Sequence, residues 1–420
     1  EYAASFGIDT IVCDHHLPAD ELPNCFALLN PKQPGCEYPF KELSGAGVAF
    51  KMLSALVPYI GLTMDSVFDH LDLLALSIGA DLVDITGENR ILAYHGMLNL
   101  REHMRPGIRA MLQVAGIEEA PKTVRDMSFS LGPRINAAGR VGHALTAAKL
   151  LMANDEGSAL ELASQLETMN QARRDIDEDL TEEAIALMAE QPPGRSCTIV
   201  HGEGWHRGVL GIVASRLVEQ RYCPTIVLSE ENEVLTGSAR SVPGIDIHEA
   251  FEKCRHLIEQ FGGHPMAAGL TIRKENMEAF TTELNAAIAA QTEDDIPKPT
   301  VSFHMPININ ELNPTMYKEF ERLGPFGPCN EVPVFMAKGV VTAIPPRTVG
   351  HGGRHLKLVV QSAENPLHRF EAIGFGMGER IDEVRAWRSF DVVFTLARNT
   401  FRGKSTLNLH LRDIRVHKFV

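Results

Sequence analysis

The feature that most constrains the fold is a short apolar run, Ile11–Cys13, that stops abruptly at Asp14, His15 and His16. Such a run predicts a buried strand, and Pro18 prevents further strand pairing beyond it. In an open parallel sheet, ligands bind beyond the carboxyl ends of the strands. A carboxylate and two imidazoles at that place offer oxygen and nitrogen donors to a divalent metal ion. The alternative is a surface loop with two chance histidines, because short motifs match by chance.

Length and composition describe an ordinary globular protein. The 420 residues are enough for about two to four domains. No apolar run approaches membrane-spanning length, and no signal peptide is visible at the start. The seven cysteines include no CxxC pair, which argues against a zinc ribbon or a disulfide framework and favours a reducing cytoplasm.

The charge is divided unevenly along the chain. The net charge is −14, but the residues from Lys298 onward contain 17 Lys and Arg against 11 Asp and Glu. A basic C-terminal part on an acidic body predicts that this part contacts a polyanion, although ordinary drift in surface charge is the alternative.

The first part of the chain, to about residue 154, alternates between strand and helix patterns. An apolar helical run over 71–79 is followed by Asp81 and Asp84. A carboxylate that emerges from an apolar element is costly to bury unless a metal or a donor satisfies it. Asp81 is therefore predicted to be either a metal ligand that converges with His15 or a helix cap, and the residues alone leave both open.

Two arginines and an asparagine flank a predicted turn over 129–142, which leads into a helix over 144–152. They are Arg134, Asn136 and Arg140. Arginine suits bidentate phosphate contact, and a helix N-terminus adds N–H donors. The alternative is a loop that the arginines stabilise by hydrogen bonds.

One or two long polar helices over 156–191 precede a second α/β pattern, either as a spacer or as a one-sided core helix. The second pattern contains strands, a helix over 209–219 and a helix over 246–260. That last helix leads to Gly262, Gly263 and His264, where paired glycines expose backbone amides to a phosphate and His264 adds a donor. The alternative here is a helix C-cap.

About five short strands follow residue 297, with partial alternation of apolar and polar residues. Their number and the basic charge predict a small barrel such as an OB-fold. The aromatic residues Phe370, Phe375, Phe394 and Phe401 are candidates for base stacking, with barrel core as the alternative that we expect for most of them.

Together these motifs resemble one family. Asp14-His15-His16 resembles the motif that gives the DHH phosphoesterases their name, and Gly262-Gly263-His264 resembles the signature of the DHH-associated domain. Residues 132–140 and 323–328 are similar to the RecJ exonucleases within this family. The resemblance implies an α/β fold in four parts: a DHH-type parallel-sheet domain (1–154), a connecting helix (155–191), a DHH-associated substrate-binding α/β domain (192–296) and an OB-like nucleic-acid-binding β-barrel (297–420).

The family resemblance implies a 5′–3′ exonuclease of DNA repair and recombination that hydrolyses single-stranded DNA with two Mn²⁺ or Mg²⁺ ions. The implied partner is single-stranded DNA. A helicase or a single-strand-binding protein is a further implied partner, and no membrane contact is implied. By resemblance His15 and Asp81 are metal ligands, His16 contacts the scissile phosphate, and Asp14 orients the histidines. The implied contacts to the DNA backbone are made by Arg134, Asn136, Arg140, Arg240, Gly262, Gly263 and His264.

One departure from the family pattern is serious. Family members have two aspartate motifs upstream of Asp-His-His, whereas thirteen residues precede Asp14 here, with Asp9 the one aspartate among them. The chain is then either a fragment or a degenerate member, and we expect it to have little or no nuclease activity alone. The rival functions are a DHH phosphoesterase of short oligonucleotides and a non-catalytic homologue that binds single-stranded DNA.

Overall fold

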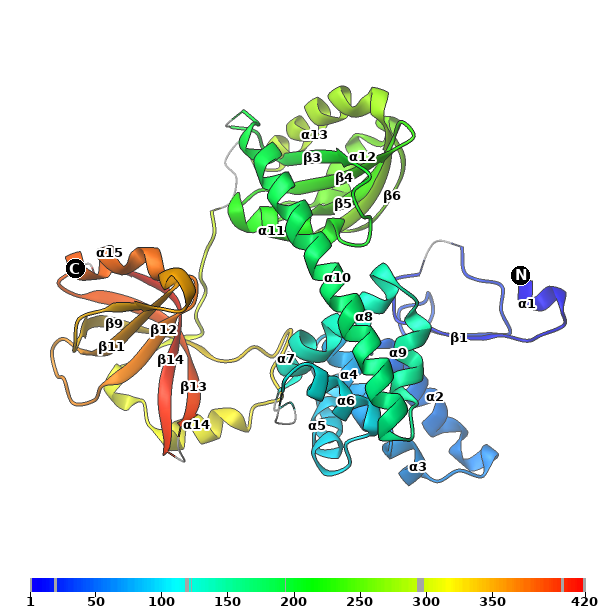
Figure 1. Ribbon diagram of the computed structural model, residues 1–420. Coiled ribbons are helices and arrows are strands. Elements are labelled where there is room, and N and C mark those ends of the chain that lie inside the picture. Colours follow the sequence, from blue (N-terminus) through cyan, green and yellow to red (C-terminus); the bar gives the residue numbers. More distant parts are fainter. Residues whose placement is uncertain are drawn as a thin grey trace. The chain divides into compact units, whose positions relative to one another are not determined.

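In the computed structural model the chain forms two compact units (Figure 1). Unit 1 contains residues 1–104, 119–132 and 300–420, and unit 2 contains residues 105–118 and 133–299. The structure describes residues 2–18, 21–117, 121, 123–192, 194–292, 298–401 and 404–417, without the side chains of residues 400, 401 and 404.

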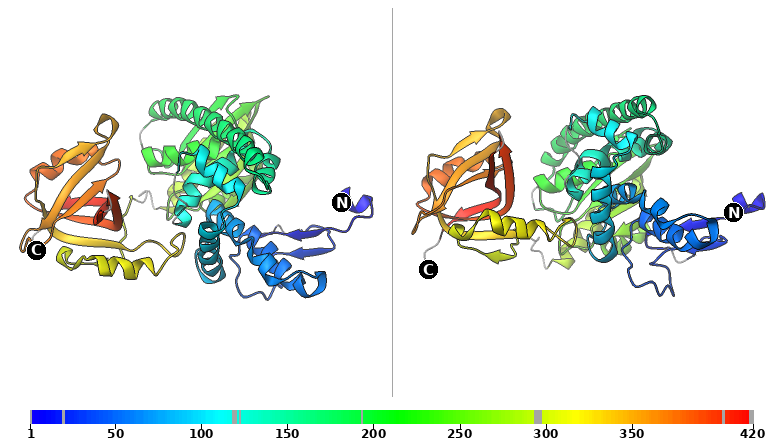
Figure 2. Two further views of the ribbon diagram at one scale, coloured as in Figure 1. Left: turned by 60° about the horizontal axis from the view of Figure 1, so that its bottom comes forward. Right: turned by 90° about the horizontal axis from the view of Figure 1, so that it is seen from below.

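Two short parallel strands begin unit 1. The predicted strand is present as β1 (Ile11–Cys13), and it pairs with β2 (Ala27–Leu29), with Ile11 opposite Ala27 and Cys13 opposite Leu29. The left view of Figure 2 shows the two strands side by side. The prediction that β1 is buried is wrong, because Ile11 is 53% exposed and β2 is its one partner among the described strands.

Helices pack against these strands and form the first core of unit 1. They are α2 (Gly45–Ile60), α3 (Met64–Phe68), α4 (Leu71–Asp81), α5 (Gly87–Glu102) and α7 (Val124–Asp126). A further short helix, α1 (Tyr2–Ser5), precedes β1 in the chain. The helix α2 begins where the Ser44 hydroxyl accepts a hydrogen bond from the Gly47 N–H. A Cβ at Gly96 would lie 2.1 Å from the Leu71 carbonyl oxygen, so a glycine there allows α5 to pack closely on α4.

Unit 2 contains the helices α6 (Pro106–Val114), α9 (Ala144–Leu151) and the long α10 (Glu156–Ala189), and α8 (Gly132–Val141) from its second residue onward. The turn predicted over 129–142 is wrong, because this segment continues from a π-helical turn (Met127–Leu131) into α8. The reason is that Pro133 fits the first turn of a helix, where its missing N–H costs nothing, and Ala137 and Ala138 favour helix after it. Of the one or two long helices predicted over 156–191, the structure has one, α10, with Asp155 as its N-cap.

The sheet of unit 2 has the strand order β3-β4-β5-β7-β6. The pair β3–β4 is parallel and the others are antiparallel. The strands are β3 (Thr198–Glu203), β4 (Thr225–Glu231), β5 (Val234–Arg240), β6 (Ile258–His264) and β7 (Ala267–Arg273), and the helices beside them are α11 (Leu210–Gln220), α12 (Ile247–Lys253) and α13 (Met277–Gln291).

The helix predicted over 246–260 is wrong in its second half. The helix α12 ends at Lys253, a 3₁₀ turn follows, and β6 begins at Ile258. Because the backbone of this segment pairs with β7, from Ile258 opposite Ile272 to His264 opposite Ala267, tertiary pairing prevails over the local helical pattern.

The last part of unit 1 is a closed barrel. Five strands follow each other around it in the order β9-β11-β12-β14-β13, and β13 pairs with β9 again, so the sheet closes on itself. This is the predicted OB arrangement. The elements are β9 (Val334–Thr342), β11 (His355–Ser362), β12 (Phe370–Gly374), β13 (Phe390–Phe401) and β14 (Lys404–Val416), with the short β8 (Met305–Pro306) and β10 (Arg347–Val349) and the helices α14 (Pro314–Glu321) and α15 (Ile381–Ala386) around them.

The phenylalanines of the barrel divide as expected. Phe370 and Phe394 are core residues, at 8% and 0% exposure, whereas Phe375 is 57% exposed. The side chain of Phe401 lies outside the described residues. Within the described ranges, no helix combines the length and apolar character needed to cross a bilayer.

Candidate metal and nucleic-acid site

The parallel pairing of β1 and β2 places the residues that follow them at one edge. Asp14 follows β1, and Asn30 follows β2. The Asp14 N–H donates to the Leu29 carbonyl oxygen at 3.0 Å, which extends the pairing by one residue. The carboxyl ends of both strands thus meet where a parallel sheet binds its ligands.

Asp14 organises the two histidines that come after it. Its Oδ1 accepts the backbone N–H of His15 at 2.7 Å and lies 2.8 Å from Nδ1 of His16. Burial alone would raise the pKa of the Asp14 carboxyl, but the hydrogen bonds from His16 and His15 together outweigh it and lower the pKa. Asp14 therefore stays ionised. It holds the His16 ring through Nδ1, so that Nε2 is the ring nitrogen left for a ligand.

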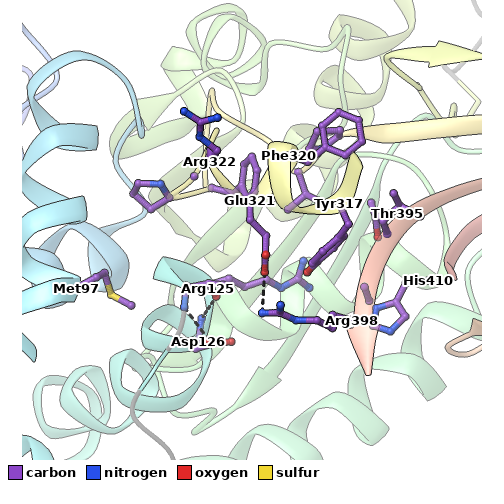
Figure 3. Close-up of a pocket in the computed structure, with 18 of the residues that line it drawn as sticks. Met97, Arg125, Asp126, Tyr317, Phe320, Glu321, Arg322, Thr395, Arg398 and His410 are labelled. Atoms are coloured by element: carbon purple, nitrogen blue, oxygen red, sulfur yellow. Dashed lines mark hydrogen bonds and ion pairs between the residues drawn. The ribbon is translucent and has the colours of Figure 1, made fainter. Parts of the chain in front are cut away.

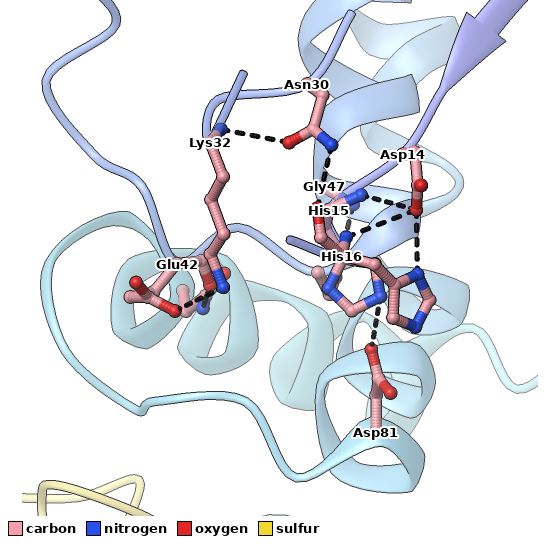
Figure 4. A network of polar contacts seen from close by, with 10 residues as sticks. Asp14, His15, His16, Asn30, Lys32, Glu42, Gly47 and Asp81 are labelled. Carbon is pink, nitrogen blue, oxygen red and sulfur yellow. Dashed lines mark hydrogen bonds and ion pairs between the residues drawn. The ribbon is translucent and has the colours of Figure 1, made fainter. Parts of the chain in front are cut away.

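His15 turns towards the end of α4. Its Nε2 lies 3.0 Å from Oδ2 of Asp81, and its side chain is 14% exposed (Figure 4). Asp81 is the last residue of α4, and Leu82 ends the helix in the left-handed conformation at φ 55°. The Asp81 carboxylate thus faces His15, which supports the ligand alternative over the cap.

The donors brought together here fit a divalent metal ion. Asp14, His15 and His16 each offer a ligand atom, and these atoms lie within 4.8 Å of one another. With Asp81 beside His15, the set contains two carboxylates and two imidazoles, the donors that Mn²⁺ and similar ions accept.

Sequence reasoning missed Asn30. Its side chain is almost fully buried, at 3% exposure; Nδ2 donates to the His16 carbonyl oxygen at 2.8 Å, and Oδ1 accepts from the Lys32 N–H at 2.9 Å (Figure 4). Lys32 in turn pairs with Glu42 at 2.8 Å. Asn30 thus supports the backbone of the motif. The signal that could have found it is the short apolar run Ala27–Leu29 directly before it.

The predicted phosphate contacts of the first stretch lie on α8. Arg134 is 6% exposed and forms an ion pair with Glu167. Asn136 and Arg140 are exposed. The guanidinium of Arg140 donates from Nη1 to the Gly208 carbonyl oxygen at 2.7 Å, which brings it to the loop before α11.

Arg240, like Arg140, lies at the start of α11: a Cβ at Gly211 would lie 2.6 Å from its Nη2. It is the last residue of β5, and its Nη1 donates to the Ala239 carbonyl oxygen at 2.8 Å. Burial lowers the pKa of the Arg240 guanidinium first, and the positive charge of Arg140 lowers it further. The structure therefore brings these two predicted arginines together.

The Gly262-Gly263-His264 stretch ends strand β6. Gly263 lies opposite Ala268 and His264 opposite Ala267, and all three residues of the stretch are exposed. Gly263 has φ 143°, and a Cβ there would lie 2.5 Å from the Ala267 carbonyl oxygen. The C-cap alternative is thus wrong, and the glycine is required by a tight β-hairpin.

Unit 1 also contains a groove of about 2020 Å³ between α5, α7, α14 and the strands β13 and β14. Arg398 lies in it with its guanidinium 5.8 Å from the Tyr317 ring centroid and 3.1 Å from Glu321 (Figure 3). Burial first, and then the charges of Arg412 and Arg125, lower the pKa of His410 in the same groove. The groove thus combines aromatic faces with positive potential.

Three ranges of the chain match models of known protein families. Residues 1–78 match the DHH family N-terminal domain, residues 194–290 the DHHA1 domain, and residues 303–413 the RecJ OB domain.

Relatives match over almost the whole chain. The single-stranded-DNA-specific exonuclease RecJ of Bacillus subtilis is 35% identical over 99% of this chain and 52% of its own length. RecJ of Haemophilus influenzae is 34% identical over 96% of this chain and 72% of the relative, and that of Escherichia coli is 32% identical over 99% and 74%. The chain thus spans about half of the first relative and about three quarters of the other two.

A solved structure has the same fold. RecJ of Thermus thermophilus in complex with Mn²⁺ superposes with a TM-score of 0.82 at 26% identity, over 99% of this chain and 59% of that one. From the matched domains, the relatives and this fold together, the chain belongs to the RecJ family of the DHH phosphoesterases.

Proposed function

We propose that this chain carries the metal site and the strand-binding surfaces of a 5′–3′ exonuclease that hydrolyses single-stranded DNA in repair and recombination. The observation that carries the proposal is the convergence of His15 and Asp81 at 3.0 Å beside Asp14 and His16. The relatives support the proposal, because they are named single-stranded-DNA-specific exonucleases. All seven cysteines are free thiols, which is consistent with a cytoplasmic location.

In this proposal His15 and Asp81 would hold Mn²⁺ or Mg²⁺, and Asp14 orients the two histidines. Ions bound there would supply an activated water and would neutralise charge on the phosphate. His16 is the residue that contacts the scissile phosphate, because its side chain is 74% exposed and its Nδ1 is already engaged by Asp14. Asp14 keeps the proton on Nδ1 and so leaves Nε2 to face the substrate.

The phosphates of the strand are proposed to meet Arg140 and Arg240, with Asn136 and the Gly262–His264 hairpin beside the strand. Arg140 and Arg240 lie close enough that the charge of one lowers the pKa of the other, as expected of a site made for an anion. Arg134 contributes by its ion pair with Glu167, which joins α8 to α10.

The groove of the OB barrel is the proposed path for the rest of the strand. Aromatic faces stack bases without regard to sequence, and arginines contact the backbone. Tyr317 and Arg398 supply one such pair, and the exposed Phe375 supplies another face. A helicase or a single-strand-binding protein that delivers an unpaired strand is the partner that this activity needs.

The test compares labelled oligonucleotides with Mn²⁺. The 420-residue chain, and the same chain fused to the upstream aspartate motifs of a relative, are given single strands labelled at the 5′ or the 3′ end, a duplex and a dinucleotide. The expected result is mononucleotide release from 5′-labelled single strands by the fusion, weak release by the chain alone, and none from the duplex.

Two results would overturn the proposal. Faster hydrolysis of the dinucleotide than of the long strand would favour the phosphoesterase of short oligonucleotides. Tight DNA binding by the fusion that is never followed by cleavage when Mn²⁺ is present, and that is unchanged in His15→Ala of the fusion, would favour a non-catalytic binder. Strong digestion by the 420-residue chain alone would refute the expectation that it has little activity.

A further inference from the structure

A charged cluster on one face of α10 has no part in the site described so far. Asn170, Arg173 and Asp177 are spaced three and four residues apart, so they lie on the same face of the helix. The side chains of Asn170 and Asp177 are fully buried, and that of Arg173 is 12% exposed. A charged group this deeply buried needs a reason, because removing it from water is costly.

Asp177 connects α10 to α11. Its Oδ2 accepts from Nη2 of Arg216 on α11 at 2.6 Å and lies 3.6 Å from Nη1 of Arg173. Arg173 in turn donates from Nη2 to Oδ1 of Asn170 at 2.9 Å. One buried carboxylate therefore holds two guanidiniums on two different helices.

Further arginines surround this carboxylate, and burial raises its own pKa although the charges of Arg216 and Arg173 oppose this. Burial lowers the pKa of Arg173, the charge of Asp177 opposes this, and the charges of Arg174, Arg140 and Arg216 lower it further; Arg140 also lowers the pKa of Arg240. The helix that carries Arg216 also begins at the arginine pair: Arg140 donates to the Gly208 carbonyl oxygen just before α11, and a Cβ at Gly211 in the first turn of α11 would lie 2.6 Å from Nη2 of Arg240. Arginines this close repel one another unless an anion lies between them.

We propose that Asp177 is a positioning residue for strand binding, which holds Arg173 and Arg216 in place beside the Arg140–Arg240 pair so that a backbone phosphate meets a preorganised cationic cluster. The inference rests on the proposed function. A ligand that meets arginines already in place loses less conformational entropy on binding, so preorganisation appears as affinity. The buried carboxylate supplies that order without touching the strand.

The test removes the charge and keeps the shape. Asp177→Asn is made in the 420-residue chain, and binding of a fluorescent 5′-phosphorylated oligothymidylate is followed by anisotropy in EDTA at several salt concentrations. The expected result is about tenfold weaker binding and a shallower dependence of log K on log salt, by about one phosphate contact. The matched control is Asp175→Asn on the same helix, whose carboxylate accepts from Gln171 at the surface and whose binding is expected to stay within about twofold of the parent.

A double-mutant cycle separates positioning from simple loss of structure. If Asp177 acts through Arg216, then Asp177→Asn combined with Arg216→Gln binds the strand no more weakly than either single variant. Arg216→Gln alone, at a side chain 42% exposed, also gives the expected loss if Asp177→Asn fails to fold.

Unchanged affinity and salt dependence in folded Asp177→Asn would overturn the inference, as would losses that add in the double variant. A parent chain that binds no strand would instead overturn the proposed function. The two failures are therefore distinguishable.

Discussion

Oδ2 of Asp81 lies 3.0 Å from Nε2 of His15, although 65 residues separate the two in the chain. If this pair is part of a metal site, Asp81→Asn should lower Mn²⁺ affinity at least about tenfold, because an amide is a weaker ligand than a carboxylate. Isothermal titration calorimetry with Mn²⁺ measures this. Asp84→Asn, three residues later and hydrogen-bonded to Cys329, is the control, and equal losses in both variants would contradict the assignment.

Asn30 offers a second prediction on the same site. Asn30→Ala leaves the His16 carbonyl oxygen and the Lys32 N–H without their buried partner, so it should lower the free energy of unfolding by about 1–3 kcal/mol. It should also weaken Mn²⁺ binding about tenfold. Thermal unfolding and calorimetry test both, with the exposed Asn24→Ala as control. Normal Mn²⁺ affinity in a folded Asn30→Ala would reject the supporting role.

A third prediction concerns acid stability. Glu88 accepts from Tyr38 at 2.7 Å and Lys51 at 2.8 Å; burial raises its pKa, but these two hydrogen bonds prevail and lower the pKa below the ordinary value of 4.5. A depressed pKa in the folded state means that the stabilisation is complete above about 4.5 and is lost as pH falls through the folded pKa.

Glu88→Gln should therefore cost about 1 kcal/mol near pH 7, since solvent screens a side chain that is 33% exposed, and the cost should shrink below about pH 4. Urea unfolding at about pH 7 and about pH 3.5 provides the measurement. The exposed Glu37→Gln, measured at the same two pH values, is the control variant. A cost that stays constant with pH would show that packing rather than charge is responsible.

The fourth prediction contrasts two helical glycines. Gly96→Ala should destabilise unit 1 by about 1–3 kcal/mol, because its Cβ would lie 2.1 Å from the Leu71 carbonyl oxygen. Gly139→Ala on α8 meets nothing within 4 Å and should stabilise unit 2 by about 0.5–1 kcal/mol through helix propensity. Melting temperatures compare the two, and a shift in the same direction for both would contradict the described packing.

The order of elements was largely predictable, because local patterns determine it. Apolar runs and turn residues predict the strand before Asp14, the long helix near 156–191 and the five barrel strands. These patterns are local in the sequence and do not depend on a distant segment. The first donors, Asp14 to His16, were predictable for the same reason: they are consecutive in the chain.

Features that depend on a distant partner were not predictable. Pairing with β7 turns the segment from Ile258 into a strand, and no local pattern contains β7. The burial of Arg134 depends on Glu167 on another helix. The contact from Asp177 to Arg216 also joins two helices, so residue spacing along α10 could not reveal it.

The position of β14 between β12 and β13 has a consequence for how the protein is made. Both neighbours leave the ribosome before β14 does, and neither can complete its hydrogen-bonding ladder until that strand arrives. The barrel therefore remains an open sheet until β14 has been synthesised. Synthesis that stops after β13 and before β14 would release a polypeptide in which β12 and β13 each have an unpaired edge, which favours proteolysis and aggregation.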